Sequence, residues 1–316
     1  MTLHDDLGTA VPSGFGSVSG APNLPDDFTT TFRSEYVTVD GLRLHAVIGG
    51  QGPALLLLGG WPQTWYAWRF VMPALARDFT VVAVDPRGVG LSDKPKDGYD
   101  SATLATDMVR LMDALGYPKF AMVGHDIGMW TGYAMAVDHP ERLERLAVAE
   151  AIIPGISPSP PLLGSRWLND FLWHFNFNRA FDANERLVQG REEIYFGHQF
   201  ATKAATPTAI PQYAVDHYVE TLRDPEALRA SFDYYRAIDQ TIEQSEARKK
   251  HKLTLPVLAI AGEDACGDSV GTEMRSVAED VISVVIPHCG HYVAEEAPDA
   301  LLDALREFLA PYKHFS

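Results

Sequence analysis

The chain has 316 residues, with 26 Lys and Arg against 42 Asp and Glu, which gives a formal net charge of −16. Hydrophobic residues make up 46% and charged residues 22%, an ordinary balance for a folded globular protein. The acidic excess argues against a nucleic-acid binder and against docking on an anionic membrane, because both need a basic surface. The length allows two modest domains or one large α/β domain with an insertion.

The two cysteines, Cys266 and Cys289, are too few for a disulfide framework, and their spacing matches no zinc motif. No segment has the glycine pattern and context of a dinucleotide site, so we expect neither cofactor nor metal. The first residues lack the basic and apolar regions of a secretory signal, and no apolar run reaches membrane-spanning length. We therefore expect a cytoplasmic protein, although a leader removed from this start would leave no trace.

The first elements along the chain are an arm and a hairpin. Residues 1–30 are rich in Gly, Pro, Ser, Thr and Asp, which predicts a loose N-terminal arm. Two alternating runs around Asp40-Gly41 then predict a β-hairpin. Short continuous apolar runs, typical of strands buried on both faces, follow at 54–58, 79–85, 119–124, 146–150, 256–262 and 281–287.

Helical patterns alternate with these runs. Apolar residues at 3.6-residue spacing predict helices at 101–116 and 299–309. Alternation of strands with helices indicates an α/β fold, in which a mostly parallel sheet carries helices on both faces.

The alternation is interrupted once. It stops near Pro154 and resumes near Pro256, and the segment between is aromatic-rich and helical in pattern. We therefore predict an α/β core of residues 31–154 and 250–316, with an inserted helical cap, or lid, of residues 155–249.

A Gly-x-Asp-x-Gly pattern links one predicted buried strand to the next helix. Gly124 and Gly128 are small enough for a tight strand-to-helix turn that lifts Asp126 above the sheet at a helix N-terminus. The usual residue at the centre of such a turn is Ser or Cys. The alternative interpretation is a polar loop residue or a helix N-cap, but the strand–turn–helix context favours a nucleophile.

The sequence resembles the α/β-hydrolases over roughly residues 33–310, and specifically the branch with an aspartate nucleophile. Gly59-Gly-Trp-Pro-Gln63 is similar to the oxyanion motif of that family, with Gly59 in place of the usual His. The run from Asp85 to Pro95 resembles the Asp-x-Arg-Gly-x-Gly-x-Ser loop. Pro287-His-Cys-Gly-His291 lies before the last helix, where the family places its catalytic His.

The chemistry of the nucleophile restricts the substrate. A carboxylate that attacks an acyl carbon gives a labile anhydride, whereas attack on a saturated carbon gives an alkyl ester that water can cleave. Asp126 therefore indicates an epoxide or an alkyl halide. His291 is the predicted base that activates water for the second step. The resemblance implies that the backbone N–H groups of Trp61 and Ile127 stabilise the oxyanion, and the family motif also has a cis peptide before Pro62.

Two acids are candidates to orient His291, and both positions are used in the family. Glu150 ends a buried strand, where a carboxylate is hard to explain without a partner. Asp264 follows the next predicted strand in a stretch that reads equally well as a polar loop. We favour Glu150 and keep Asp264 as the alternative.

The leaving group separates epoxide from halide chemistry. An opening epoxide leaves an alkoxide, which needs a proton donor facing Asp126. Cif-like epoxide hydrolases place a His and a Tyr of the lid there, and the resemblance assigns these roles to His174 and Tyr235. Without the family, aromatic residues at helical spacing would be interpreted as packing residues.

Haloacetate dehalogenases carry similar lid residues but have arginines one and four positions after the nucleophile, where this chain has Ile127 and Trp130. Haloalkane dehalogenases have a Trp directly after the nucleophile. The absence of these groups predicts an apolar pocket without an anion clamp, which suits a neutral epoxide. Beside Trp61, its predicted substrate-binding residues are Trp65, Met129, Phe171 and Phe175.

We therefore predict a hydrolase that opens a small-to-medium apolar epoxide to a vicinal diol, with water as the second reactant and without a nucleic-acid or membrane partner. The alternative is a haloacetate or haloalkane dehalogenase with the same nucleophile. A third hypothesis is a catalytically silent binding or signalling protein, against which the joint presence of nucleophile, base and acid argues. Members of the family are often dimers, so the resemblance allows a homodimer.

Overall fold

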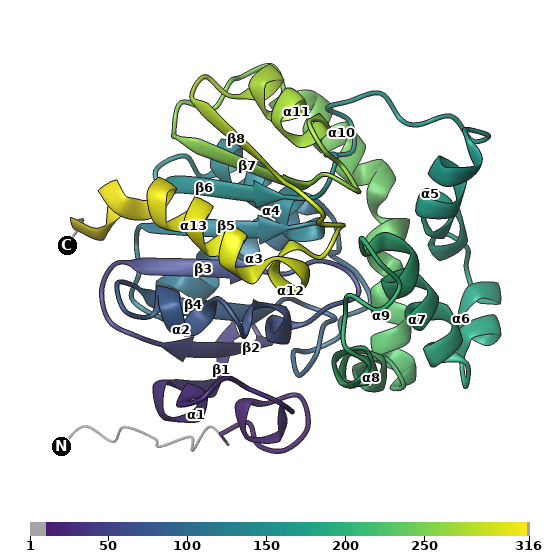
Figure 1. The fold of residues 1–316 in the computed structure, drawn as a ribbon, viewed down its shortest axis with the longest axis horizontal. Helices are drawn as coiled ribbons and strands as arrows, with labels where there is room; N and C mark the ends of the chain where they lie inside the picture. Colours follow the sequence, from purple (N-terminus) through teal and green to yellow (C-terminus); the bar gives the residue numbers. More distant parts are fainter. Residues whose placement is uncertain (1–10, 315–316) are drawn as a thin grey trace.

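An eight-stranded sheet runs through the centre of the molecule (Figure 1). The structure is a computed structural model that describes residues 11–314. In spatial order the strands are β1 (Phe32–Val39), β2 (Leu42–Gly49), β4 (Thr80–Asp85), β3 (Ala54–Leu58), β5 (Phe120–His125), β6 (Leu143–Ala149), β7 (Val257–Gly262) and β8 (Val281–Ile286). β2 is antiparallel to both of its neighbours, and all other pairs in the sheet are parallel. The predicted α/β fold with a mostly parallel sheet is confirmed.

The predicted hairpin joins β1 to β2. Val39 pairs with Leu42, so the turn consists of the two residues between them. Asp40 has φ 50° and Gly41 has φ 82°, and positive φ at both positions defines the turn type that matches the right-handed twist of a strand pair. The Asp-Gly dipeptide therefore forms the two-residue turn that its sequence predicts.

Helices cover both faces of the sheet, with α13 in front and α3 and α4 behind in Figure 1. Every residue of β3, β5 and β7 is buried, which explains why these strands read as continuous apolar runs. The helices of the core are α1 (Phe28–Thr31), α2 (Met72–Leu75), α3 (Ser101–Ala114), α4 (Ile127–Asp138), α11 (Ser269–Val277), α12 (Val293–Glu296) and α13 (Pro298–Leu309). Three short 3-10 helices span Val18–Gly20, Trp65–Trp68 and Ala310–His314.

Six further helices lie between β6 and β7 in the chain and beyond the carboxyl ends of the parallel strands (Figure 1). They are α5 (Arg166–Asn178), α6 (Ala183–Val188), α7 (Glu192–Lys203), α8 (Gln212–Thr221), α9 (Pro225–Arg236) and α10 (Ile238–Arg248). All six fall within residues 155–249, the segment predicted as the cap, which we call the helical insertion. Side chains tie it to the core: Tyr234 donates a 2.6 Å hydrogen bond to the carbonyl of Arg87, and Arg248 pairs with Asp138.

Part of the N-terminal segment packs on the core, with residues 16–18 and Phe28 buried, whereas residues 1–10 of the predicted arm lie outside the described residues. The carbonyl of Gly16 accepts a 2.8 Å hydrogen bond from the indole N–H of Trp65. Phe28 is buried, and its ring lies 5.9 Å from that of Trp65. Val18 and Phe28 are thus seated in the core, whereas Val11 and Phe15 of the same predicted arm are exposed.

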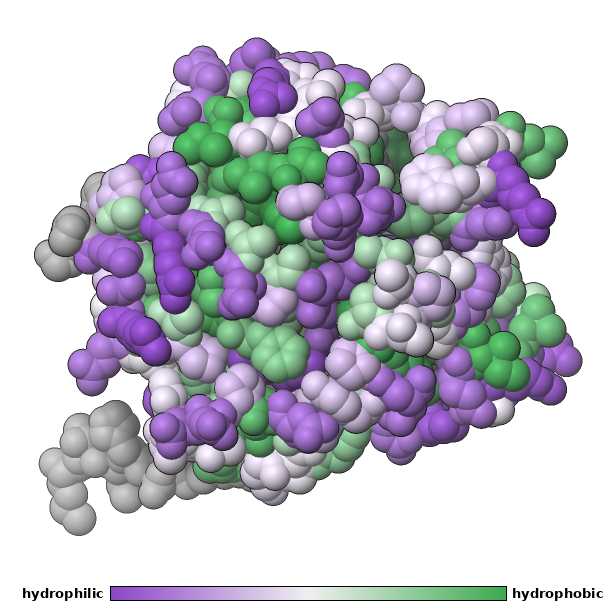
Figure 2. All heavy atoms as spheres, in the orientation of Figure 1, coloured by the Kyte–Doolittle hydropathy of each residue, from purple (hydrophilic) through white to green (hydrophobic). Residues whose placement is uncertain are grey.

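The outer surface is mixed in polarity. Figure 2 shows hydrophilic side chains over much of the visible face and a hydrophobic patch over the β7–β8 edge of the sheet. Ile282 on β8 is 51% exposed, as expected for an edge strand that lacks a neighbour on one side. Within the described part of the chain, no helix has both the length and the apolar character needed to cross a membrane.

Candidate active site

Asp126 stands on a sharp turn between β5 and α4. Its backbone has φ 54° and ψ −116°, a conformation that non-glycine residues rarely adopt, and α4 begins at the next residue. The side chain is 15% exposed, so the carboxylate is nearly removed from solvent. A strained residue held between a rigid strand and a rigid helix is typical of a functional position.

Glycines on both sides make this turn sterically feasible. A Cβ at Gly124 would stand 2.2 Å from the carbonyl oxygen of Gly128. A Cβ at Gly128 would stand 2.3 Å from the carbonyl oxygen of Leu58, on the neighbouring strand β3. Both distances are far below a van der Waals contact, so the Gly-x-Asp-x-Gly spacing reflects close backbone packing under the carboxylate.

Two backbone N–H groups face the carboxylate of Asp126. That of Trp61 donates a 2.9 Å hydrogen bond to Oδ1, and that of Ile127 is a further donor. Trp61 belongs to the loop of residues 59–63 that follows β3, which we call the oxyanion loop, and its peptide bond to Pro62 is cis. A Cβ at Gly60 would stand 2.2 Å from the Cβ of Asp126, so the loop approaches Asp126 as closely as only glycine permits.

The charge of Asp126 depends on opposing effects. Burial raises the pKa of its carboxyl above the ordinary value. His291, the N–H groups of Trp61 and Ile127, and Lys203 all favour the carboxylate and lower the pKa. The site thus holds a desolvated carboxylate, which is a stronger nucleophile than a hydrated one.

His291 lies between Asp126 and Glu150. Its Nδ1 is 3.3 Å from Oε2 of Glu150, and its Nε2 is 3.6 Å from Oδ2 of Asp126. Glu150 is fully buried directly after β6, and its Oε1 accepts hydrogen bonds from the N–H groups of Gly262 (2.6 Å) and Cys266 (3.3 Å). These donors satisfy a buried carboxylate that would otherwise be costly, and they aim its other oxygen at the imidazole.

Asp264, the alternative acid, occupies a different environment. It is exposed on the turn after β7, and its backbone N–H donates to the carbonyl of Cys289. Of the two candidate acids, the fold brings the carboxylate of Glu150 to the imidazole of His291.

The backbone of His291 is fixed from two directions. Its carbonyl lies 2.8 Å from Nε2 of His125, and its N–H donates a 2.9 Å hydrogen bond to the carbonyl of Lys203 at the end of α7. Burial and the nearby positive charge of His291 lower the pKa of His125 to about 3. His125 is therefore neutral at pH 7, so its Nε2–H can donate to that carbonyl. His125 thus anchors the loop of His291.

His174 on α5 and Tyr235 on α9 reach the site from the helical insertion. The imidazole of His174 stacks on the indole of Trp61, with ring centroids 5.3 Å apart and planes at 12°. The ring of Tyr235 lies 5.3 Å from that of Trp61 and 5.4 Å from that of His174, edge-on to both. Since the backbone of Trp61 binds Asp126, both side chains lie over the residue that holds the Asp126 carboxylate.

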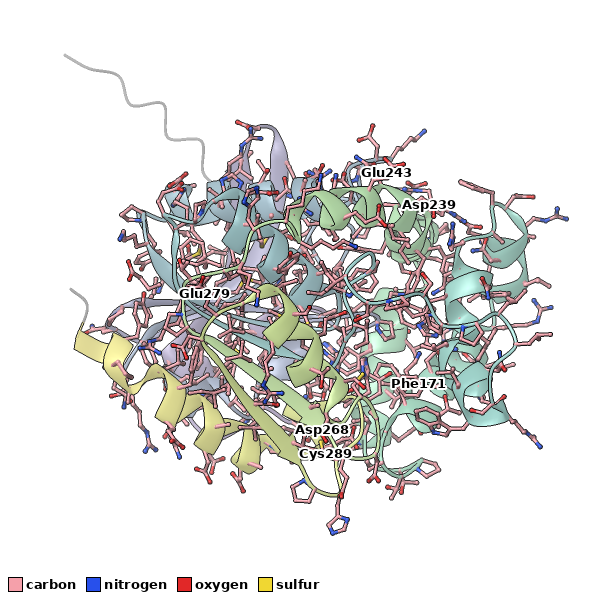
Figure 3. The ribbon with its side chains drawn as sticks, turned by 90° about the horizontal axis from the view of Figure 1, so that it is seen from above. Phe171, Asp239, Glu243, Asp268, Glu279 and Cys289 are labelled. Atoms are coloured by element: carbon pink, nitrogen blue, oxygen red, sulfur yellow. The ribbon has the colours of Figure 1, made fainter. Side chains whose placement is uncertain are left out.

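Two of the predicted substrate-binding residues lie beside these groups. The ring of Phe171 is 6.3 Å from that of His291, and Figure 3 shows Phe171 on the side of the helical insertion. The ring of Phe175 is 5.2 Å from that of Tyr235. Met129 is fully buried in the first turn of α4.

Trp65 does not lie among these rings, so its prediction as a substrate-binding residue is not supported. Its indole is fully buried against Phe28 and Tyr66, at the N-terminal segment. Its backbone N–H donates a 2.8 Å hydrogen bond to Oδ1 of Asp85, which is buried at the end of β4. These contacts secure the chain just after the oxyanion loop, a structural role that the sequence alone did not reveal.

One charged residue of the site was missed in the sequence analysis. Lys203 is only 4% exposed, and its Nζ lies 3.0 Å from Nδ1 of His174 and 3.0 Å from Oε1 of Gln199. The same Nζ is 5.6 Å from the ring centroids of Trp61 and Phe171. The sequence predicts an apolar pocket without an anion clamp, and in addition the end of α7 brings an ammonium group beside Trp61 and Phe171.

A signal for this residue was present in the helical spacing. Phe196, Gln199, Phe200 and Lys203 follow one another at the intervals that place side chains on one face of a helix, and all four are buried in α7. A Gln and a Lys on an otherwise apolar face indicate a buried polar pair with a partner elsewhere.

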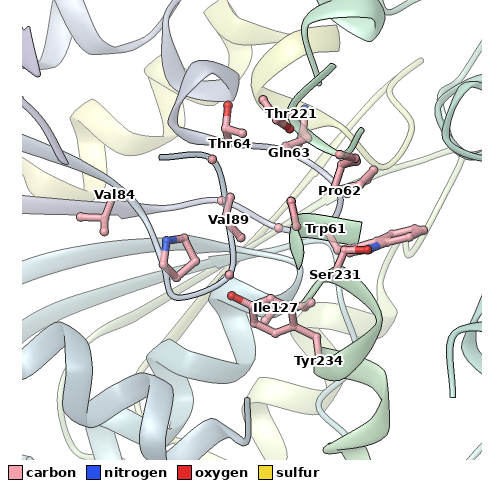
Figure 4. Close-up of a pocket in the computed structure, with 17 residues that line it drawn as sticks. Trp61, Pro62, Gln63, Thr64, Val84, Val89, Ile127, Thr221, Ser231 and Tyr234 are labelled. Carbon is pink, nitrogen blue, oxygen red and sulfur yellow. The ribbon is translucent and has the colours of Figure 1, made fainter. Parts of the chain in front are cut away.

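A pocket lies alongside the oxyanion loop (Figure 4). Trp61 and Ile127, whose N–H groups face the carboxylate of Asp126, line it together with Ser231 and Tyr234 of α9. Asp126 is not among its lining residues, so this is a neighbouring space between the loop and the insertion. Within residues 11–314, no group of three or more His, Cys, Asp or Glu side chains is placed to hold a metal ion.

Comparison with known proteins assigns the family. The α/β hydrolase fold family matches residues 53–298. The chain belongs to this family. A soluble epoxide hydrolase of Corynebacterium sp. (strain C12) is 33% identical over 90% of this α/β-hydrolase and 100% of its own length. A fluoroacetate dehalogenase of Burkholderia sp. is also 33% identical, over 88% of this chain and 94% of its own.

A solved structure agrees with this assignment. The crystal structure of wild-type Cfl2 from Burkholderia cenocepacia superimposes with a TM-score of 0.85 and 37% sequence identity, and the match covers 88% of this α/β-hydrolase and 96% of that chain. The predicted family and the prediction of a hydrolase are thus confirmed. The two relatives above carry the names of the two reactions that the sequence leaves as alternatives.

Proposed function

We propose that this α/β-hydrolase is an epoxide hydrolase that converts a small-to-medium apolar epoxide into a vicinal diol through an alkyl ester on Asp126. One observation carries the proposal. The carboxylate of Asp126 faces two backbone N–H donors on one side and Nε2 of His291, 3.6 Å away, on the other. That arrangement suits attack on a saturated carbon, followed by hydrolysis of the resulting ester.

In the first step, a carboxylate oxygen of Asp126 attacks an epoxide carbon as the carbon–oxygen bond of the ring breaks. The leaving oxygen takes up a proton or strong hydrogen bonds, which we assign to His174 and Tyr235. Burial raises the pKa of the Tyr235 hydroxyl well above its ordinary value, so the phenol keeps its proton at neutral pH and is available as a donor.

In the second step, His291 removes a proton from water, which attacks the carbonyl carbon of the ester. The N–H groups of Trp61 and Ile127 then stabilise the oxyanion that forms on Asp126. Glu150, 3.3 Å from Nδ1, orients the imidazole and stabilises its protonated form. The proposed cycle uses water and the epoxide and requires no metal or cofactor.

A dehalogenase that acts on a halogenated carboxylate is the second candidate. It is favoured by the buried ammonium of Lys203, which could hold a carboxylate, and by the relative named fluoroacetate dehalogenase. The absence of a cationic side chain at Ile127 and at Trp130 argues for the neutral epoxide, as does the aromatic wall of Trp61, Phe171 and Phe175.

The test compares styrene oxide with fluoroacetate in the unmodified chain and in a His291→Gln variant. For an epoxide hydrolase we expect diol formation by the unmodified chain and a stable mass increase equal to one styrene oxide on Asp126 of the variant. Multiple turnovers in water labelled with heavy oxygen should also place the label in Asp126, because water oxygen replaces the oxygen transferred to product. Fluoride release without consumption of any epoxide would establish the dehalogenase instead.

A further inference from the structure

Lys203 is a buried ammonium group whose neighbours are mostly neutral. The nearest polar atoms on its Nζ are the imidazole of His174, with Nδ1 at 3.0 Å and Nε2 at 3.3 Å, and the amide oxygen of Gln199. The faces of Trp61 and Phe171 complete its surroundings. A buried cation without a direct carboxylate partner is unfavourable for stability. Its presence here therefore indicates that Lys203 has a role in the site.

The charge that balances Lys203 is the nucleophile. Burial lowers the pKa of the Lys203 ammonium to about 7, and the negative charge of Asp126 is the effect that opposes this shift. The carboxylate of Glu296, close to the end of α7, is occupied by the backbone N–H groups of Ala205, Gly290 and Tyr292. Further titratable side chains around the site are His291 and Tyr292 on the core side and Tyr235 on α9.

The proposed epoxide opening requires a source for the proton that the leaving oxygen takes up. Burial, with the positive charges of Lys203 and His291, lowers the pKa of His174 well below its ordinary value, so His174 is neutral at pH 7. A neutral imidazole that gave its proton to an alkoxide would become an imidazolate, which is a poor product. His174 can act as the donor only if another group supplies a proton to the ring at the same time.

We propose that Lys203 supplies the proton that the epoxide oxygen takes up during ring opening, delivered across the imidazole of His174. This inference rests on the proposed epoxide hydrolase function. Nζ lies 3.0 Å from Nδ1 and 3.3 Å from Nε2, so the ammonium contacts the imidazole directly and can transfer a proton to the ring as the ring releases one to the leaving oxygen. Because Lys203 acts through His174, it is a positioning residue for the proton and does not itself touch the substrate.

The proton and charge balance close over the whole cycle. As the bond from Asp126 to carbon forms and the epoxide bond breaks, the leaving oxygen keeps the electron pair and takes a proton from His174. The ring is reprotonated by Lys203, which becomes a neutral amine. Ester hydrolysis then regenerates the Asp126 carboxylate and releases one proton, which restores the ammonium.

The negative charge of Asp126 and the positive charge of Lys203 are therefore neutralised in the same step and restored in the same later step. Esterification removes the negative charge of Asp126, which is the charge that stabilises the Lys203 ammonium. Transfer of the proton at the same step avoids an isolated buried cation next to a neutral ester. This coupling gives the alkoxide a proton source whose acidity rises as the bond to Asp126 forms.

The experiment measures alkylation of Asp126 alone, in the His291→Gln background where hydrolysis is blocked. Mixing with styrene oxide from pH 5.5 to 9, followed by quenching and intact mass measurement, gives the rate of ester formation. We expect this rate to fall as the pH rises through about 7, where Lys203 loses its proton. Adding Lys203→Met should slow alkylation by about 100-fold and remove this pH dependence.

Lys203→Arg separates proton supply from charge. A guanidinium keeps the positive charge but does not give up a proton in this pH range, so we expect alkylation to stay slow and independent of pH. Lys203→Gln, which keeps a hydrogen-bonding side chain of similar length, serves if either variant fails to fold by circular dichroism, and it should be equally slow. Lys250→Met, on the exposed surface, is the matched control and should alkylate at the parent rate.

Two results would overturn the inference while leaving the epoxide hydrolase intact. One is an alkylation rate for Lys203→Met within threefold of the parent. The other is full recovery by Lys203→Arg, which would make the charge, as an anion holder, the contribution of this side chain. If styrene oxide and other epoxides never modify Asp126 in the parent, the proposed function itself fails, and this inference fails with it.

Discussion

The backbone N–H of Trp61 donates a 2.9 Å hydrogen bond to Oδ1 of Asp126, although the two residues are 65 positions apart in the chain. The same Trp61 carries on its indole the stacked imidazole of His174, a residue of the helical insertion. One residue of the oxyanion loop thus contacts the nucleophile through its backbone and the insertion through its side chain. Movement of the insertion would therefore displace the backbone N–H that binds the carboxylate of Asp126.

Replacing the nucleophile is the first prediction. Asp126→Ser should lower epoxide turnover by at least about 1000-fold, because a serine hydroxyl at this turn cannot form the cleavable alkyl ester. Chromatography of the diol product measures the turnover rate, and circular dichroism shows whether the fold is retained. Residual turnover close to that of the unmodified chain would mean that another residue carries the chemistry.

The orienting acid gives a second prediction with a built-in control. Glu150→Gln should slow hydrolysis of the Asp126 ester by about 100-fold, since the amide no longer stabilises the imidazolium of His291. Alkylation, which precedes the action of His291, should change little, so ester should accumulate and be visible by mass. Asp264→Asn, on the exposed turn, should leave both steps within about twofold. The reverse pattern would assign the acid role to Asp264.

Two adjacent tyrosines of α9 allow a matched comparison. Tyr235→Phe should slow alkylation by epoxide by about 100-fold, because a hydroxyl donor to the leaving oxygen is lost. Tyr234 instead donates to the carbonyl of Arg87, so Tyr234→Phe should cost about 1 kcal/mol of unfolding free energy and leave alkylation near the parent rate. Quenched mass measurement and urea unfolding provide the two readouts. Equal effects on alkylation would mean that Tyr235 only packs.

Glycine substitutions test the packing under the nucleophile. Gly60→Ala should destabilise the fold by about 2 kcal/mol and abolish most activity, because its Cβ would meet that of Asp126 at 2.2 Å. Gly197→Ala, in the middle of α7, meets no atom within 4 Å and should stabilise the chain by about 0.7 kcal/mol. Thermal and urea unfolding distinguish the two directions. An unaffected Gly60→Ala variant would contradict the close approach of the oxyanion loop.

A buried histidine outside the site predicts acid sensitivity. Burial lowers the pKa of His217 from 6.5 to about 4, so between these values the unfolded chain binds a proton that the folded chain does not. The contribution of neutral His217 to the free energy of unfolding is therefore complete above pH 6.5. This contribution is lost as the pH falls toward 4, at up to about 1.4 kcal/mol per pH unit. His217→Phe should flatten this dependence, as measured by urea unfolding at several pH values. An unchanged slope would place the acid sensitivity elsewhere.

Much of the fold follows from local patterns. The run of residues 54–58 forms β3 with the same bounds, and the Asp40-Gly41 turn forms the predicted hairpin. Buried parallel strands need continuous apolar runs, and a two-residue hairpin needs residues that tolerate positive φ. Both requirements can therefore be recognised within a few residues of sequence. The burial of Phe28 in the N-terminal segment did not follow from local patterns, because Phe28 packs against the distant Trp65.

The sequence by itself determined the tight turn at Asp126, because the glycines that permit the turn stand two residues on either side of it, and its motifs predicted the family. Only the tertiary structure brought Glu150 within 3.3 Å of His291, moved Trp65 away from the site and placed Lys203 against His174. Those outcomes depend on how the strand ends and the helical insertion pack together. Local residue spacing does not predict these distances, since the partners lie in segments far apart along the chain.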